Sequence, residues 1–264
     1  MFLTEYEKQL SDEYLKNGYI IQKAADPDAL DRIKESIAGI VLDILGIKES
    51  EPADVLLNQI HKRVPVTDLN NFRLKVIQQM NSLDDFRFNY FKVARPYLET
   101  LAGNELSMQL RVNLSIQFPN DDSSLLPVHS DTWAGDSPFE IVVWLPLVDC
   151  YKTKSMYILP PGPSKELIAD FKNKSGISSE ELYQFISKDV KWLEIKYGEV
   201  LLFDQGYPHG NRINEETDTR WSMNCRFKGV FTPYGDKKIG EFFEPVTLRV
   251  ASQIGMEYKF PKAK

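Results

Sequence analysis

The sequence predicts a mostly β core with flanking helices, arranged as a barrel or a double-sheet jelly roll behind a helical N-terminal part. Up to about residue 105 the apolar side chains recur at helical spacing, whereas from Ser107 the chain reads as short β-prone runs separated by turn residues. No internal repeat, low-complexity tract or Pro/Gly-rich linker interrupts the 264 residues. We therefore expect a single domain over 1–264.

The N-terminal part is predicted to be helical except for one early strand. After Gly18, the residues Tyr19 to Ile21 form a short β-prone run, and Asp26-Pro27-Asp28 is a helix-start signal. The expected helices cover Thr4 to Asn17, Ala29 to Leu45, Glu51 to Lys62, Asn70 to Met80 and Leu83 to Leu101. This region, 1–105, is expected to support the β core.

The core is expected over 106–231, followed by a C-terminal extension over 232–264. Two helices, Ser164 to Lys172 and Ser178 to Ser187, are predicted between the strands. The predicted strands are Leu106 to Phe118, Phe139 to Leu147, Ser155 to Leu159, Lys191 to Ile195, Val200 to Phe203 and Arg220 to Phe231.

Composition narrows the class of protein. With 42% hydrophobic and 27% charged residues the chain is an ordinary globular one. The net charge of −6 and the dispersed Lys and Arg residues argue against nucleic acid as a partner. No apolar run approaches the roughly 20 residues of a membrane span, and the N-terminus lacks a signal-peptide pattern, so a cytoplasmic protein is expected.

Two cysteines, Cys150 and Cys225, are too few for a disulfide framework or a four-thiolate zinc site, and we expect buried thiols.

Two of the three histidines are candidate metal ligands. His129 and Asp131 lie two positions apart, so on an extended chain their side chains project to the same side. His209 follows the β-prone run that ends at Phe203. Two His and one carboxylate form the facial triad of non-haem Fe(II) oxygenases. The third, His61, lies in a polar helical stretch and is expected at the surface.

An arginine that could bind a carboxylate follows the distal histidine, His209, by eleven positions. Arg220 starts a β-prone run, and its guanidinium could capture a carboxylate beside the metal, with a further hydrogen bond from Ser222. Arg226 lies on the same face of a regular strand and is the alternative anchor. Together these residues could hold a dicarboxylic keto acid that chelates iron at its other end.

With these motifs the chain resembles the Fe(II)/2-oxoglutarate-dependent dioxygenases, in their phytanoyl-CoA-hydroxylase-like branch. The resemblance covers roughly 106–231 and depends on His129-Ser-Asp131, His209, Asn214 and Arg220-Trp-Ser222. The run LSIQFPNDDSSLLPVHSDTWAGDSPFEIVVWLPLVDCYKTKSMYILP also resembles oxygenases of bacterial carbohydrate-biosynthesis clusters. One departure is the stretch from Pro160 to Ser164, which lacks the histidine that many relatives carry after a Pro-Gly-Ser turn.

The resemblance implies a double-stranded β-helix, a cupin-like form of the jelly roll, with His129, Asp131 and His209 as Fe(II) ligands. Arg220 and Ser222 would bind the distal carboxylate of 2-oxoglutarate, and O2 would be the second co-substrate. A polar residue on the strand before the H-x-D motif would also contact the keto acid. Gln117 is the preferred match there and Asn113 the second. Because Asp131 is present, halogenation is not expected.

The resemblance also implies a small, sugar-like substrate, since aromatic and polar side chains lie near the triad in the sequence. The candidates for contact with it are Trp133, Asp136, Tyr151, Lys154, Tyr207 and Asn211. For each, packing of a loop or simple solvation is the alternative role, and Trp144 is expected in the core. The expected reaction is hydroxylation of a carbohydrate or sugar-containing metabolite, with release of succinate and CO2. Two alternatives remain open: a hydroxylase of an amino acid or other small metabolite, and a catalytically silent jelly-roll sugar-binding protein or isomerase. The sequence does not indicate an oligomeric state.

Overall fold

The larger of two antiparallel sheets forms the centre of the molecule. The computed structural model describes residues 2–49, 51–170, 172 and 176–261. Along the sheet the strands follow the order β1 (Tyr19–Lys23), β7 (Glu199–Asp204), β4 (Ile141–Pro146), β9 (Arg220–Gly229), β2 (Leu106–Gln109) and β10 (Phe243–Pro245). β3 (Asn113–Gln117) pairs with the first half of β9, on the edge opposite β4 and in line with β2. Strands far apart in sequence are thus neighbours, as in a jelly roll.

The smaller sheet packs against the face of the larger sheet that is turned away from the N-terminal helices. It has the order β6 (Lys191–Trp192), β5 (Tyr157–Ile158) and β8 (His209–Gly210). A core cluster that includes Trp144, Ile158 and Phe203 fills the space between the two sheets. This antiparallel double-sheet core with flanking helices confirms the predicted fold class.

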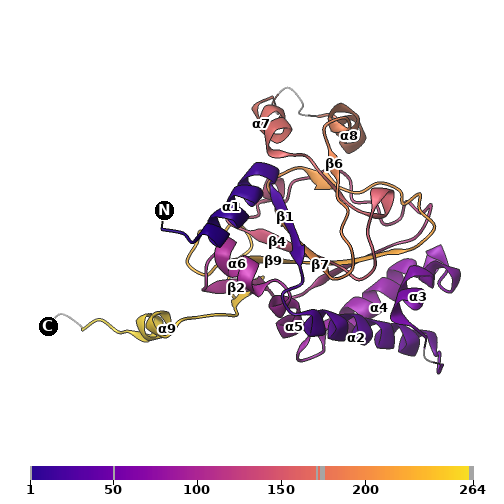
Figure 1. Cartoon of the computed structure of the whole chain (residues 1–264), viewed down its shortest axis with the longest axis horizontal. Coiled ribbons are helices and arrows are strands. Elements are labelled where there is room, and N and C mark those ends of the chain that lie inside the picture. The colour runs from indigo at the N-terminus through magenta and orange to yellow at the C-terminus, as the bar shows by residue number, and fades with distance from the viewer. Residues whose placement is uncertain (1, 50, 171, 173–175, 262–264) are drawn as a thin grey trace.

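The N-terminal helices cover the outer face of the large sheet, whereas α7 and α8 lie beside the small sheet (Figure 1). α9 ends the C-terminal extension, away from the body of the molecule. The helices are α1 (Glu5–Asn17), α2 (Pro27–Leu45), α3 (Ala53–Asn58), α4 (Leu69–Asn81), α5 (Phe86–Lys92), α6 (Arg95–Leu101), α7 (Pro161–Ala169), α8 (Ser179–Ile186) and α9 (Val250–Glu257), with 3-10 turns η1 (Ile60–Lys62), η2 (Val66–Asp68), η3 (Asp131–Ala134) and η4 (Lys152–Lys154).

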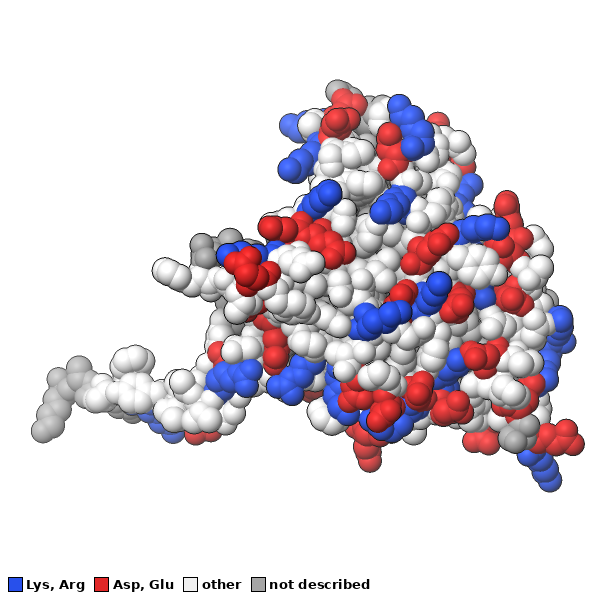
Figure 2. All heavy atoms as spheres, in the orientation of Figure 1, with Lys and Arg blue, Asp and Glu red and all other residues white. Residues whose placement is uncertain are grey.

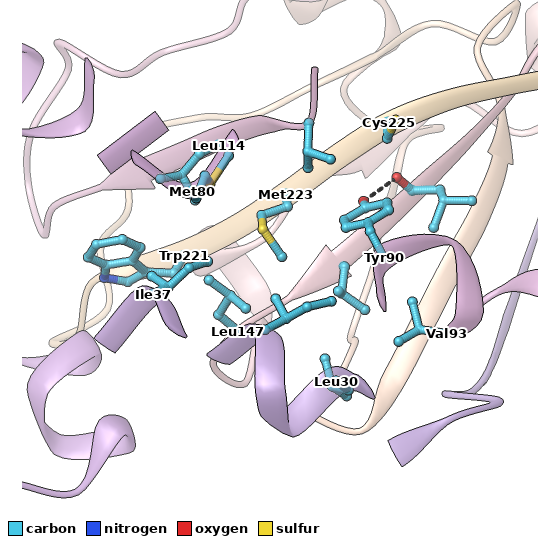
Figure 3. Packing of buried hydrophobic residues seen from close by; sticks show 14 of the residues in the cluster. Leu30, Ile37, Met80, Tyr90, Val93, Leu114, Leu147, Trp221, Met223 and Cys225 are labelled. Atoms are coloured by element: carbon cyan, nitrogen blue, oxygen red, sulfur yellow. Dashed lines mark hydrogen bonds between the residues drawn. The ribbon is translucent and has the colours of Figure 1, made fainter. Parts of the chain in front are cut away.

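Strand alternation separates the apolar layer from the site. On β9, the side chains of Trp221, Met223, Cys225 and Phe227 are buried in the cluster shared with the helices. Their polar neighbours on the strand therefore face the small sheet. Figure 3 shows Trp221 and Met223 among residues of α2, α4 and α5, with the Tyr90 hydroxyl donating to the backbone carbonyl of Val143 on β4 at 2.9 Å.

Several predicted segments are shorter or divided. The helix expected over Leu83 to Leu101 is two helices, α5 and α6, because Pro96 lacks an amide hydrogen and starts a new helix. Likewise the helix expected over Glu51 to Lys62 is α3 followed by η1. The strand expected over Leu106 to Phe118 is β2 and β3, because the Asn81 side chain bonds both backbone groups of Val112 between them.

The bounds of one further helix and one further strand also differ from the prediction. The helix expected over Ser164 to Lys172 begins at Pro161, where proline suits the first helical turn, and ends at Ala169; residue 171 lies outside the described residues. The strand expected to end at Ile195 stops at Trp192, and Ile195 forms a single bridge with Cys150. β10 and α9, in the extension, were not predicted.

Charged side chains of both signs are interspersed over the face that Figure 2 shows. Within the described part of the chain, no helix combines the length and the apolar character that crossing a membrane requires.

Tyr90 provides a test of the packing between helices and sheet. Its ring is fully buried, and its hydroxyl is bonded across the interface. We expect Tyr90→Phe to lower the free energy of unfolding by about 1 kcal/mol, because one hydrogen bond is lost, and Tyr90→Ala to lower it by about 3–5 kcal/mol, because a cavity is added. Urea unfolding measures both values. Equal losses for the two variants would contradict this account.

Candidate metal centre and adjoining cavity

The two predicted histidine ligands are brought together by backbone pairing. The amide of His129 donates to the carbonyl of His209 at 3.0 Å, and the amide of His209 donates to the carbonyl of His129 at 2.8 Å. This antiparallel bridge joins the loop before η3 to strand β8 and places the two ring centroids 4.3 Å apart. The expected pairing of residues that lie 80 positions apart is therefore present.

Each imidazole is held in the tautomer that a metal requires. Nδ1 of His129 lies 2.8 Å from the carbonyl oxygen of Pro127, and Nδ1 of His209 lies 2.8 Å from that of Tyr207. A carbonyl oxygen only accepts, so each Nδ1 carries the hydrogen and each Nε2 keeps its lone pair. Burial, together with the neighbouring His129 ring, lowers the pKa of His209 to about 4, so this ring is neutral at pH 7.

Asp131 completes the group. Its amide donates to the carbonyl of Gln205 at 3.1 Å, which fixes the start of η3 beside β8. The ligand atoms of His129, Asp131 and His209 all lie within 4.8 Å of one another. Burial alone would raise the pKa of the Asp131 carboxyl, but the neighbouring His129 ring and the charge of Arg226 outweigh burial and hold that pKa well below its usual range. The carboxylate is therefore ionised, and the three side chains offer one oxygen and two nitrogen donors to a divalent cation.

A small cavity of about 70 Å³ lies beside the candidate metal centre. Of the three candidate ligands His209 lines it, and Arg220 and Ser222 of β9 line it as well. Its apolar wall comes from Trp144, Met156 and Phe203. The remaining lining residues are Ser115, Leu126, Gly210, Asn211 and Asn224.

Arg220 is a buried cation that pairs with no carboxylate in the described part of the chain. Only 4% of the residue is exposed. Its guanidinium donates to the carbonyl of Ser155 at 3.0 Å and to the hydroxyl of Ser115 at 2.8 Å, and no ion pair to it is found among the described residues. Burial lowers the pKa of Arg220 to about 10, which leaves it charged at neutral pH.

Three buried polar atoms around this guanidinium, Arg220 Nε, Ser222 Oγ and Ser155 Oγ, find no hydrogen-bond partner within the described residues. Native proteins rarely leave such atoms unpaired, because each unmade bond costs about 1–3 kcal/mol. A carboxylate entering the cavity could accept from Arg220 and Ser222 at once. The donors and the charge thus fit the distal carboxylate of 2-oxoglutarate, while the triad fits the metal.

The two predicted contacts on β3 lie elsewhere. The Gln117 amide donates to the backbone carbonyl of Arg212 at 2.7 Å and does not line the cavity. Asn113 is exposed, although its amide donates to Asn224, which does line it. The cavity residue on this face of β3 is Ser115, which the sequence reasoning missed. Alternation along β3 allowed all three positions, and only the neighbouring loop distinguishes them.

The six predicted substrate residues fall in different places. Trp133 lies on η3 with 39% of its surface exposed, beside Asp131. Asn211 lines the cavity, but its side-chain oxygen accepts from the amide of Leu126. Asp136 is buried and paired with Lys237 and Arg226.

The other three do not line the cavity. The Tyr207 ring packs so tightly on Gly18 that a Cβ added there would lie 2.6 Å from a ring carbon. Lys154 is buried, and its ammonium donates to Asn58 at 2.7 Å. Tyr151 lies beside this ammonium, 5.6 Å from it to the ring centroid.

Four further expectations have clear outcomes. Arg226 is on the same face as Arg220, but it bonds Asp131 and does not line the cavity. Trp144 is buried in the core, as predicted, and also forms part of the cavity wall. His61 is half-buried rather than on the surface, because its Nδ1 bonds the Thr219 hydroxyl at 2.9 Å. Cys150 and Cys225 are buried free thiols.

The unpaired charge of Arg220 predicts an unusual stability effect. We expect Arg220→Met to leave the free energy of unfolding of the ligand-free protein within about 1 kcal/mol of the wild-type value, or to raise it, because a buried uncompensated charge is removed. In contrast, Arg226→Met strips buried carboxylates of their partner and should cost about 3–5 kcal/mol. Urea unfolding of both variants measures this, and equal losses would show that Arg220 has a purely structural role.

Comparison with known proteins supports the fold. No family of known sequences and no curated protein matches the chain. Among solved structures, a non-haem monooxygenase, the ThoJ–Ni complex, superposes with a TM-score of 0.57 and 13% identity, over 90% of this chain and 84% of that one. AviO1 from Streptomyces viridochromogenes gives a TM-score of 0.56 and 13% identity, over 88% and 99%.

HygX from Streptomyces hygroscopicus, solved with nickel and 2-oxoglutarate bound, gives a TM-score of 0.51 and 13% identity, over 88% of this chain and 89% of that one. The phytanoyl-CoA-hydroxylase-like branch remains a prediction. At these identities the likeness concerns the fold. The chain therefore has the cupin-like jelly-roll fold, with flanking helices, of solved non-haem metal enzymes.

Proposed function

We propose that the chain is an Fe(II)- and 2-oxoglutarate-dependent oxygenase that hydroxylates a C–H bond of a small, sugar-containing metabolite. One observation carries the proposal: the cavity that His209 lines is also lined by the buried Arg220, to which no ion pair is found among the described residues. A keto acid with a carboxylate at each end satisfies both sites. Its chelating end would meet the metal, and its distal carboxylate would pair with Arg220 and Ser222.

The chain's own residues would bind, orient and shield the reactants. Nε2 of His129 and His209 and one oxygen of Asp131 would hold Fe(II). Bound Fe(II) and 2-oxoglutarate would supply the oxidising power, with O2 and the keto acid consumed to give succinate, CO2 and a C–OH group on the substrate. The apolar wall of Trp144, Met156 and Phe203 would exclude water from the cavity, which strengthens the pairing of Arg220 with a carboxylate.

The substrate would approach from the side on which the triad is open. The His129 side chain is 30% exposed, whereas His209 is buried, so access is from the His129 side. There Trp133, two residues beyond Asp131, presents a partly exposed aromatic surface. A sugar ring has apolar C–H faces that stack on indole, which supports a sugar-containing substrate.

The competing functions make different demands on these residues. A sugar-binding jelly roll or an isomerase has no use for a buried, uncompensated arginine in a cavity that a candidate metal ligand also lines. Arg220 therefore favours the oxygenase. Hydroxylation of an amino acid or another small metabolite would use the same triad and cavity. Only the substrate side distinguishes these two hydroxylases.

The metal and keto-acid sites can be tested together. Anaerobic addition of Fe(II) and 2-oxoglutarate should give the weak visible charge-transfer band of an iron-chelated keto acid. His209→Ala should abolish the band, because it removes a metal ligand, and His61→Gln is the matched histidine control that should keep it. If the wild-type protein shows no band, or if His209→Ala retains it, the proposed function is wrong.

The substrate class has its own test. Succinate release in air should rise when sugar-containing metabolites are supplied and stay at its basal rate with free amino acids. Trp133→Ala should raise the KM for the active compound between twofold and about tenfold, because a stacking contact of about 0.5–1.5 kcal/mol is lost. Stimulation by amino acids alone would favour the other hydroxylase, with the oxygenase chemistry intact.

A further inference from the structure

Arg226 lies behind the metal centre, in contact with one of its three predicted ligands. Its Nη2 donates to Oδ2 of Asp131 at 2.7 Å. Both side chains are largely buried, and both belong to the interior between the sheets. The sequence reasoning considered Arg226 only as an alternative keto-acid anchor, and the structure shows a different contact.

The two oxygens of Asp131 have different surroundings. Oδ1 lies 3.5 Å from Nε2 of His129, which is the nitrogen left free for a metal. Oδ2 is the atom that accepts from Arg226. One carboxylate oxygen therefore faces the metal position, and the other faces away from it into an ion pair.

Arg226 is itself held from several sides. Its Nε donates to Oε1 of Gln205 at 2.9 Å, and the Gln205 amide in turn donates to Oε2 of Glu140 at 2.8 Å. Further carboxylate oxygens, from Asp136 and Glu140, lie 3.8 and 3.9 Å from the guanidinium. Lys237, from the loop after β9, pairs with Asp136 at 2.7 Å. The guanidinium is consequently unable to follow Asp131 if that carboxylate rotates.

From this arrangement we infer that Arg226 is a positioning residue that keeps Asp131 a one-oxygen metal ligand. The inference rests on the proposed metal site. An octahedral ion held by three protein atoms keeps ~3 positions for water and co-substrates. A second Asp131 oxygen would occupy one of these. By engaging Oδ2, Arg226 prevents the carboxylate from chelating and keeps that position open.

The planar guanidinium is suited to this role. Its Nε and Nη2 donors are fixed in one rigid plane, so one group can bond Gln205 and Asp131 at the same time. A lysine ammonium placed here could still bond Asp131, although it lacks the fork that fixes its orientation. Charge and direction therefore contribute separately, and substitutions can separate them.

The number of water molecules on a bound metal ion tests the inference directly. Mn²⁺ is added to the protein without co-substrate, and the water-proton relaxivity of the bound ion is measured. Arg226→Gln should lower this relaxivity by about one-third, because the freed second oxygen of Asp131 displaces one of ~3 waters. Arg226→Lys should retain most of the wild-type value. Arg63→Gln, which breaks a bidentate ion pair with Glu51 in the helical part of the molecule, should leave it unchanged.

The outcomes separate this inference from the proposed function. If the wild-type protein binds no Mn²⁺, or if His209→Ala binds it equally well, the metal site itself is refuted. If the wild-type protein binds Mn²⁺ through His209 and folded Arg226→Gln has the same relaxivity, only the positioning role is refuted. Should Arg226→Gln fail to fold, Gln205→Met removes the acceptor that orients the guanidinium and should also lower the relaxivity; an unchanged value there would equally overturn the inference.

Discussion

Strand β9 is buried on both of its faces, and the rest of the site depends on how it meets two opposite chemical demands. One face presents Trp221 and its apolar neighbours to the helices. The other presents Arg220, Ser222, Asn224 and Arg226 to the interior between the sheets. Because side chains alternate on a strand, the apolar contacts that fix the register of β9 also fix the position of every polar group behind it. A slip of one residue would exchange the two sets.

The polar face carries two arginines with opposite environments. Arg226 is surrounded by carboxylates and an amide, so its charge is compensated within the protein. Among the described residues, Arg220 has a serine hydroxyl and a carbonyl as its acceptors and no carboxylate, so its charge is not compensated there. Burial of an uncompensated charge is unfavourable unless something else supplies the opposite charge. This asymmetry supports a structural role for Arg226 and the ligand-binding role that we propose for Arg220.

Sequence reasoning reached the elements of the site that depend on local rules. The H-x-D spacing places His129 and Asp131 on one side of an extended chain, and regular alternation places Arg220, Ser222 and Arg226 on one face. It failed where a side chain is selected by a distant neighbour. The Gln117 amide donates to the carbonyl of Arg212, whereas the Ser115 hydroxyl accepts from Arg220. Nothing in the local pattern of β3 distinguishes these two positions. Tyr151 and Lys154 are close to the triad in sequence, but the Lys154 ammonium donates to Asn58 and lies over the Tyr151 ring.

The C-terminal extension shows why some function is invisible to local patterns. The residues after β9 return to the loop that follows Asp131, a candidate metal ligand: the Asp236 amide donates to the carbonyl of Gly135, and Lys237 pairs with Asp136. Asp136 approaches Arg226, which bonds Asp131. A continuous series of polar contacts thus joins the loop after β9 to the candidate metal centre. Because each member satisfies a charge that would otherwise be buried alone, the series stays intact only as a unit, and the geometry of Asp131 depends on residues more than a hundred positions away in the chain.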